Sequence, residues 1–290
     1  MDLDDINIFR AVALYGSMTQ AAEVLGYAQS SVTARIRKLE AALKVNLLYR
    51  HAKGVQLTPA GRIFLEQGLK ITRLTEELPR LLSLNSVPEG LLRLGSMETT
   101  AAIRLPALLK YYHTHYDRVE LSLHTDTSEG LINKILTYEL DLAFVASPVN
   151  HPELDEFEAF REELVLVSAS GQEQQPISEI LRQRTILVFR AGCSYRLLLE
   201  RYLLELRATA LKRFEFGSLE AIIGGVAAGI GISLLPRSVV DSRLRTGELS
   251  AYELPVHLRY CPTLLIRRKD AVQTAASASF LDLARGASAF

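Results

Sequence analysis

Residues 18–43 read MTQAAEVLGYAQSSVTARIRKLEAAL, and this stretch decides the fold of the N-terminal part of the chain. Apolar residues recur at helical spacing over residues 18–25, and Gly26 follows where a helix end requires a left-handed residue. Apolar residues four, three and four positions apart then define one face of a second helix over residues 29–43. These residues are Val32, Ile36, Leu39 and Leu43. The pattern predicts a helix-turn-helix.

The other face of the second helix carries small hydroxyls and an amide in its first turn and a half. A recognition helix in a major groove meets base edges with this part of its surface. The predicted base-reading residues are Gln29, Ser30, Ser31 and Thr33.

Basic residues follow one turn later, and six of them stand against one acid, Glu40, between Ser31 and Lys53. Such side chains contact phosphates and fix the register of a protein on DNA without reading its sequence. The expected phosphate contacts are Arg35, Arg37, Lys38, Lys44, Arg50 and Lys53. The alternative is an amphipathic helix whose basic face is merely solvated, and the small wing expected after the helix argues against it.

A longer set of residues surrounds this motif in a fixed order. It comprises IFRAVA at 8–13, Gly16-Ser17, Ala21-Ala22, Leu25, Gln29, Ile36, Lys38-Leu39-Glu40, Leu43, Val45, Leu47-Leu48, Arg50 and LTPAG at 57–61. With these residues, the stretch resembles the DNA-binding domain of LysR-type transcriptional regulators. The resemblance implies an all-α winged helix-turn-helix over residues 1–61 and double-stranded DNA as a partner.

Three positions depart from the pattern of that family. The family usually has serine where this chain has Ala28, so the cap of the second helix is expected to be lost. Arginine is frequent where Ala34 stands, and glycine where Lys44 stands. These departures concern the operator sequence rather than the docking mode.

A long linker helix is expected over residues 62–88. Its apolar residues approximate an a/d heptad seam, interrupted by Gln67, which calls for a second helix. The seam consists of Phe64, Ile71, Leu74, Leu78 and Leu81. The seam predicts a homodimer, and packing of the helix onto the rest of its own chain is the alternative. The family resemblance implies a homotetramer built from dimers. Pro79 should kink or end the helix near Leu78.

Strands alternate with helices over residues 91–290, which predicts an α/β domain with mainly parallel strands. Strands are expected at 91–94, 119–123, 140–145, 164–167, 185–189, 213–216, 231–235 and 263–266, with a helix around 276–283. Two such sets resemble the two-lobed, periplasmic-binding-protein-like effector domain of the same family. Lobe one is then 91–161 plus 266–290, and lobe two is 162–265.

Ligands of open α/β sheets bind beyond the carboxyl ends of strands, where helix N-termini present unsatisfied N–H groups. Four loops have this position, at 95–100, 125–128, 190–196 and 217–218. The expected effector-binding residues are Ser96, Met97, Glu98, Thr99, Thr100, Thr125, Thr127, Ser128, Cys193, Ser194, Arg196, Gly217 and Ser218. Their hydroxyls suit a small polar or anionic effector held between closing lobes, although any single hydroxyl could simply cap a helix.

Two residues of these loops leave the nature of the signal open. Glu98 opposes an anion, so an effector with both an acidic and a basic group also fits. Cys193 precedes a predicted helix, where a thiol has a lowered pKa and could sense oxidants. The simpler reading is a half-buried lining residue, because Cys261 is far along the chain.

The composition of the whole chain narrows its class. The 290 residues, 48% of them apolar, suggest two or three units and a substantial core. No apolar stretch spans a bilayer and the N-terminus is acidic, so a cytoplasmic protein without a membrane partner is expected.

We see no catalytic constellation and predict neither a metal nor another cofactor, since the two cysteines lack metal-ligand spacing. The expected function is an effector-controlled, sequence-specific transcription regulator. The alternative is a solute-binding or enzymatic α/β protein with an accessory helical domain.

Overall fold

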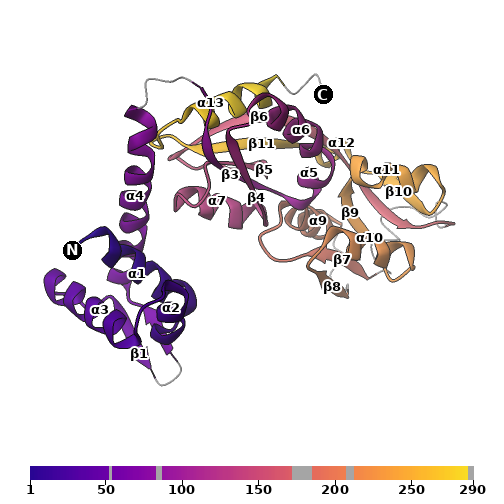
Figure 1. Cartoon of the computed structure of the whole chain (residues 1–290). Helices are drawn as coiled ribbons and strands as arrows, with labels where there is room; N and C mark the ends of the chain where they lie inside the picture. Colours follow the sequence, from indigo (N-terminus) through magenta and orange to yellow (C-terminus); the bar gives the residue numbers. More distant parts are fainter. Residues whose placement is uncertain (52–53, 83–86, 172–184, 207–211, 287–290) are drawn as a thin grey trace. The chain divides into compact units, whose positions relative to one another are not determined.

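The computed structural model describes residues 1–51, 54–82, 87–171, 185–206 and 212–286. The chain divides into two compact units, Met1–Asn85 and Ser86–Phe290. Figure 1 shows helices and a small hairpin in the first unit, and two α/β lobes in the second.

The first unit contains three short helices, a two-stranded wing and one long helix. Its elements are α1 (Leu3–Tyr15), α2 (Met18–Leu25), α3 (Gln29–Leu43), β1 (Leu48–His51), β2 (Gly54–Leu57) and α4 (Pro59–Leu82). The apolar face predicted for α3 enters the core through Val32, Ile36 and Leu39, whereas Leu43 is 40% exposed. The wing strands pair antiparallel. The winged helix-turn-helix fold is therefore confirmed.

The ends of α2 and α3 explain two of the sequence features. Gly26 ends α2 with φ 70°, a left-handed conformation that glycine adopts without steric cost. Ala28 precedes α3 without a side-chain hydrogen bond, as expected for a helix that has lost its cap. Lys44 ends α3 with φ 54°, so this lysine takes the left-handed conformation that glycine favours.

The helix α4 continues through Pro79 and ends at Leu82, between the point near Leu78 where Pro79 was expected to kink or end it and the end of the expected linker at residue 88. Proline removes a single amide hydrogen bond, and the other bonds of this 24-residue helix carry it through its last turn. Phe64 packs edge-on against Phe9 at 5.0 Å and so belongs to the core of the first unit. The apolar stripe that remains on α4 consists of Ile71, Leu74 and Leu78, which are 40%, 55% and 53% exposed; the side chain of Leu81 lies outside the described residues.

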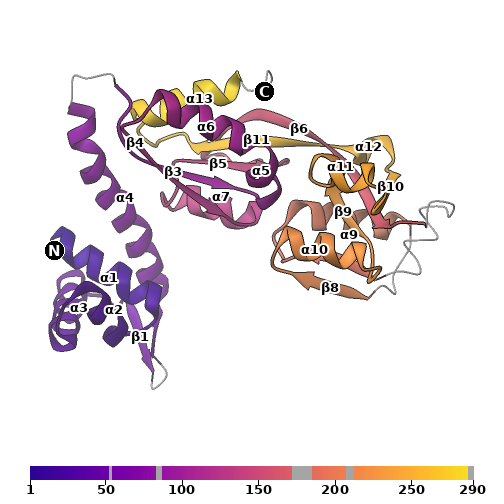
Figure 2. The same ribbon diagram turned by 45° about the vertical axis from the view of Figure 1, so that its right-hand side comes forward.

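Lobe one of the second unit is a sheet between two helical layers (Figure 2). Its elements are β3 (Gly90–Ser96), α5 (Glu98–Ile103), α6 (Leu105–His115), β4 (Val119–Thr125), α7 (Ser128–Leu136), β5 (Leu142–Ala146), the first part of β6 (Leu154–Ala169), β11 (Tyr260–Arg268) and α13 (Ala275–Arg285). Residues of β5 alternate between the two layers. Leu142 and Phe144 pack with α6 and α13, whereas Ala143 and Val145 pack on the side of α7.

Lobe two contains the second part of β6 and the elements that follow it. These are β7 (Ile186–Phe189), α9 (Ser194–Glu205), β8 (Arg213–Phe216), α10 (Leu219–Ala227), β9 (Ser233–Pro236), α11 (Arg237–Arg245), β10 (Leu249–Glu253) and α12 (Val256–Arg259). Here β6 alternates as well, with Val165 and Val167 in the α10 cluster and Leu164 and Leu166 in the α9 cluster.

Two long antiparallel strands, β6 and β11, correct the sequence prediction (Figure 2). Parallel pairing joins β3 to β4 and β5, and β7 to β8, whereas β6 and β11 make only antiparallel pairs. The expectation of mainly parallel strands is therefore wrong. Residues of β11 pair with β5 and with residues 154–163 of β6, whereas residues 164–169 of β6 pair with β9 and β10.

Candidate functional site

The expected base-reading residues lie on the first turns of α3. Gln29, Ser30 and Ser31 are exposed, and Thr33 is half-buried. The residues of α3 that pack into the core are instead Val32, Ile36 and Leu39. The structure thus leaves these polar groups accessible at the N-terminal end of the second helix of the motif.

Two of the expected phosphate contacts are paired with acids of the same domain. Arg35 Nη1 lies 3.6, 3.8 and 3.4 Å from carboxylate oxygens of Asp2, Asp4 and Asp5. Asp2 and Asp5 also form a capping box at the start of α1. The sequence prediction missed this contact because the acids precede Arg35 by 30 or more residues.

Arg50 is held by the buried acid Glu40. Arg50 Nη2 donates to Glu40 Oε2 at 2.7 Å, while the amides of Leu47 and Leu48 donate to Oε1 at 2.9 and 3.2 Å. Glu40 therefore joins α3 to the wing, and we assign Arg50 a structural role.

Three expected phosphate contacts differ from Arg35 and Arg50. Arg37, Lys38 and Lys44 are exposed, and none of them makes an ion pair within the part of the chain that the structure describes. Lys53 lies outside the described residues. The accessible positive charge near the α3 surface thus comes from Arg37, Lys38 and Lys44.

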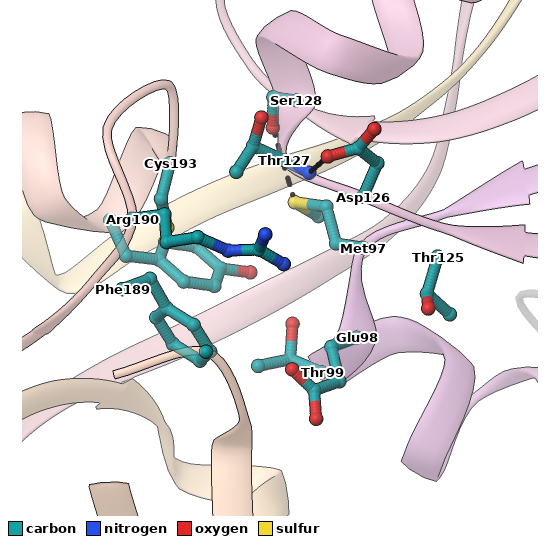
Figure 3. A pocket seen from close by; sticks show the side chains of 12 residues that line it. Met97, Glu98, Thr99, Thr125, Asp126, Thr127, Ser128, Phe189, Arg190 and Cys193 are labelled. Carbon is teal, nitrogen blue, oxygen red and sulfur yellow. Dashed lines mark hydrogen bonds between the residues drawn. The ribbon is translucent and has the colours of Figure 1, made fainter. Parts of the chain in front are cut away.

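A cavity of about 160 Å³ lies between the two lobes, at the carboxyl ends of β3, β4, β7 and β8 (Figure 3). It is lined by Met97, Glu98, Thr99, Thr125, Asp126, Thr127, Ser128, Phe189, Arg190, Cys193, Tyr195 and Gly217. The cavity is where the rule for open α/β sheets places a ligand.

Hydrogen bonds within lobe one hold its wall of the cavity in place. Thr127 caps α7 by accepting from the Gly130 amide at 3.2 Å. Ser128 accepts from the Ala146 amide at 3.2 Å and donates to Met97 Sδ at 3.3 Å. Asp126 Oδ1 accepts from the Thr127 amide at 2.8 Å, and its carboxylate borders the cavity. Figure 3 shows these residues on one side of the space.

Two hydrogen bonds cross from lobe one to lobe two beside the cavity. Glu98 Oε1 accepts from the Leu219 amide at the start of α10, at 3.0 Å. The Glu129 amide donates to the Gly192 carbonyl at 3.4 Å. Gly192 has φ 87°, and an added Cβ would lie 2.9 Å from Glu129 Oε2. Only glycine fits this approach of the lobes.

The lobe-two wall supplies a cation, two aromatic rings and a thiol. Arg190 is exposed, and its guanidinium extends into the cavity in Figure 3. Tyr195 is 2% exposed, and burial raises the pKa of its hydroxyl. The hydroxyls of Tyr195 and Thr99 lie near each other, yet neither oxygen has a hydrogen-bond partner of ordinary geometry.

The lowered thiol pKa that the redox-sensing alternative requires is not found at Cys193. Burial raises the pKa of this thiol, and the nearby amides of Arg196 and Tyr195 lower it by less. Cys261 is also closer than its sequence distance suggested, since the two thiols interact electrostatically. Burial and then the charge of Glu162 raise the pKa of Cys261 to about 12. Both cysteines are reduced and buried.

Eight of the thirteen expected effector residues line the cavity, and five do not. Ser96 is fully buried and donates to the Met97 carbonyl, and Ser218 caps α10. Arg196 is bound to Glu200, Glu215 and the Phe189 carbonyl at 2.7–3.1 Å. The remaining two residues off the cavity are Thr100, which is 2% exposed, and Ser194. Helix capping and internal pairing explain Ser96, Ser218 and Arg196.

Four lining residues were not among the thirteen: Asp126, Phe189, Arg190 and Tyr195. Each belongs to a segment that the sequence did indicate. Arg190 directly follows β7, so its place at the carboxyl end of a strand was the signal that could have found it.

Across the described ranges, no three His, Cys, Asp or Glu side chains gather as a metal ion would require. In those same ranges no helix combines the length and the apolarity needed to cross a bilayer.

Comparisons with known proteins agree with this geometry. Residues 3–62 match the family model "Bacterial regulatory helix-turn-helix protein, lysR family", and residues 85–289 match "LysR substrate binding domain". The chain is 44% identical over 282 residues to the "Uncharacterized HTH-type transcriptional regulator YusT" of Bacillus subtilis (strain 168), covering 97% of this chain and 95% of that protein. It is 42% identical over 281 residues to the HTH-type transcriptional regulator GltR of the same strain, with the same coverage.

Among solved structures, full-length CbnR complexed with its target DNA resembles this chain with a TM-score of 0.68. The two chains are 24% identical, and the match covers 99% of this chain and 100% of CbnR. At this identity the likeness concerns the fold.

Proposed function

The chain belongs to the LysR family of bacterial helix-turn-helix transcription regulators, and from this premise we propose which of its residues meet DNA and effector. Its function is sequence-specific DNA binding under the control of a substrate-binding domain, and its relatives are regulators rather than enzymes. We propose that it acts in the cytoplasm as a homodimer or homotetramer.

Base edges are read by Gln29, Ser30, Ser31 and Thr33 in this proposal, with Arg37 and Lys38 on the phosphates. The observation that carries it is the exposure of these groups on α3, while Arg35 and Arg50 are paired inside the domain. Polar groups at the start of a helix fit the base edges of a major groove, and the basic groups one turn later reach the backbone.

Dimerisation through α4 is supported by its exposed apolar stripe. The stripe consists of Ile71, Leu74 and Leu78, which are spaced three and four residues apart and therefore share one helix face. A second copy of this face would bury them and pair two reading heads about a two-fold axis.

The effector binds in the cavity between the lobes, as the pairs of polar loops at strand ends suggest. Because Glu98 and Glu129 already connect the lobes beside the cavity, a ligand there alters the free energy of lobe closure. Regulation then requires that the ligand bind two quaternary arrangements of the regulator unequally.

The test is fluorescence anisotropy of a labelled duplex from upstream of this protein's own gene, titrated at two salt concentrations with random DNA as competitor. We expect competitor-resistant binding by the full chain. Gln29→Ala and Ser31→Ala should change the preferred sequence, whereas Lys38→Ala should weaken binding to all duplexes. Equal losses on specific and random DNA for all three variants would contradict the assigned roles.

A further inference from the structure

The cavity between the lobes is bordered by charges of both signs. Asp126 and Glu98 lie on the lobe-one side, and Arg190 enters from the lobe-two side (Figure 3). We infer that the effector is a small zwitterion of the amino-acid type, with its carboxylate at Arg190 and its ammonium group at Asp126. The inference rests on the proposed function, because it names the ligand class of the same cavity.

The anionic end of the ligand has three donors on the cavity wall. Arg190 makes no ion pair within the described residues and offers the planar fork of donors that suits a carboxylate. Tyr195 and Thr99 also line the cavity; their buried hydroxyls lie near each other, and neither makes a hydrogen bond of ordinary geometry. Buried polar groups are nearly always well hydrogen-bonded, so two hydroxyls that are at most weakly bonded to each other have capacity left for ligand atoms.

The cationic end of the ligand has one available carboxylate. Asp126 uses Oδ1 to accept from the Thr127 amide, and an ionised carboxylate has further lone pairs for an ammonium group. The exposed His124 ring lies 3.7 Å from Asp126 Oδ2, and the Asp126 side chain keeps 31% of its surface exposed. Thr125 and Thr127 add hydroxyls to the same wall.

Glu98 determines which way round the ligand lies. Its carboxylate accepts from the Leu219 amide, so a protein acid already occupies the N-terminus of α10 on that side of the cavity. A second anion there would meet like charge, which disfavours it in a partly buried site. The carboxylate of the ligand is therefore directed to Arg190.

Charge and size together exclude two other ligand classes. A simple anion would leave Asp126 beside it without a counter-charge, and a simple cation would do the same at Arg190. The volume of about 160 Å³ resembles that of cavities that hold about six heavy atoms, which matches the smaller amino acids.

The test uses the full chain, the twenty standard amino acids and calorimetric titration of each one that raises the unfolding temperature. For every amino acid that binds, the carboxylic acid lacking the amino group and the amine lacking the carboxyl group are titrated as matched probes. We expect at least one small amino acid to bind saturably, and both matched probes to bind roughly 100-fold more weakly.

Three variants locate the binding site. Arg190→Gln and Asp126→Asn should each weaken amino-acid binding roughly 100-fold, and asparagine can still accept from the Thr127 amide, which preserves the loop. Arg201→Gln removes the same charge from an exposed position on α9 away from the cavity, and should bind as the unaltered protein does. Circular dichroism checks that all three fold.

Binding of no amino acid, or equal binding of the probe without an amino group, would overturn the inference. So would normal binding by both Arg190→Gln and Asp126→Asn. The DNA titration separates this failure from that of the proposed function. If DNA binding responds only to other molecules, the ligand class is wrong and the regulator proposal stands; if an amino acid binds without affecting DNA binding, the coupling is wrong and the ligand class stands.

Discussion

The DNA-reading domain and the cleft of the effector domain contain similar arginines whose surroundings differ in one respect. Arg35 and Arg50 are paired with carboxylates of their own domain, whereas Arg37, two residues after Arg35 on α3, makes no ion pair within the described residues. In the effector domain Arg196 is paired and lies off the cavity, while Arg190, six residues earlier, enters it. Internal pairing, rather than residue type or sequence position, separates structural cations from those available to a ligand.

The largest effect is expected at Glu40, the acid that holds Arg50. Glu40→Ala leaves the Leu47 and Leu48 amides and the Arg50 guanidinium without their acceptor. Leaving two buried amides without an acceptor should destabilise the first unit by about 3 kcal/mol, since each unsatisfied buried donor costs about 1–3 kcal/mol. Urea denaturation followed by circular dichroism measures the loss, and hydrogen exchange assigns it to α3 and the wing.

Glu23→Ala is the matched control for this prediction, because Glu23 is an exposed acid on α2. It should change stability by less than about 0.5 kcal/mol. Similar losses for both variants would show that Glu40 is not the connection between α3 and the wing.

The Cys193 thiol lines the cavity, but we expect it to react slowly in the folded protein. Burial raises the pKa of its thiol, so the reactive thiolate is scarce at neutral pH. Iodoacetamide should alkylate Cys193 at least roughly tenfold more slowly in the native protein than in denaturant. The reaction is run at about pH 7.5, about one unit below the ordinary thiol pKa. Mass spectrometry of the Cys193 peptide measures the rate.

Equal rates in the folded and unfolded protein would revive the redox alternative for Cys193. The peptide containing Cys261 provides an internal comparison. The pKa of this buried thiol is raised to about 12, so it should also be protected.

The paired and unpaired arginines of the reading domain should differ on DNA. Arg37→Ala and Lys38→Ala should each reduce affinity about tenfold on specific and random duplexes, and reduce the salt slope by about one. Arg35→Ala should leave the salt slope unchanged, because its guanidinium lies beside Asp2, Asp4 and Asp5. Anisotropy at several salt concentrations measures all three slopes.

A reduced slope for Arg35→Ala would mean that DNA phosphates displace these acids. Internal pairing would then fail as a guide to which arginines meet a ligand. Asp4→Asn, which removes the acid most distant from Arg35, serves as a check because it should leave the salt slope in place.

The reading domain was predictable from sequence because its signals are local. Helical spacing placed the bounds of α2 and α3, and Gly26 marked the turn between them. The pairing of Arg35 was not predictable, since it depends on how α1 packs against α3. Leu43 followed the helical period and yet is 40% exposed, because the core ends before the last turn.

The effector domain was less predictable because its sheets depend on pairing between distant segments. Alternation of strands and helices gave the correct α/β class. The antiparallel pairing of β6 with β11 was not predictable, because more than 90 residues of sequence separate the paired residues. β10 was missed altogether, because LSAYE is short and carries no strong strand signal. Loops at strand ends were placed correctly, whereas the side chain that each loop presents to the cavity depends on capping and pairing, as Ser218 and Arg196 show.

The smallest effect is expected at a paired arginine of the effector domain, Arg268, which is 3% exposed. It donates to Asp270 from Nε and Nη2 at 2.7 and 3.0 Å, and its guanidinium lies over the Tyr138 ring at 4.4 Å. Asp270→Asn should lower stability by about 0.5–1 kcal/mol, a small value because the carboxylate is more than half exposed. Ligand and DNA binding should be unchanged.

The pH dependence of this pair has a defined sign. The hydrogen bonds from Arg268 lower the pKa of Asp270 from 3.8 to about 2. A depressed carboxyl pKa stabilises the folded state above the unfolded pKa, and this contribution is lost as pH falls from about 4 to about 2. The stability difference between the protein and Asp270→Asn, measured by urea denaturation, should therefore be constant above about pH 5 and shrink below about pH 4. A stability difference that persists at pH 2 would mean that Asp270 acts through its shape rather than its charge. Arg268 would then not be an example of an arginine held by an internal ion pair.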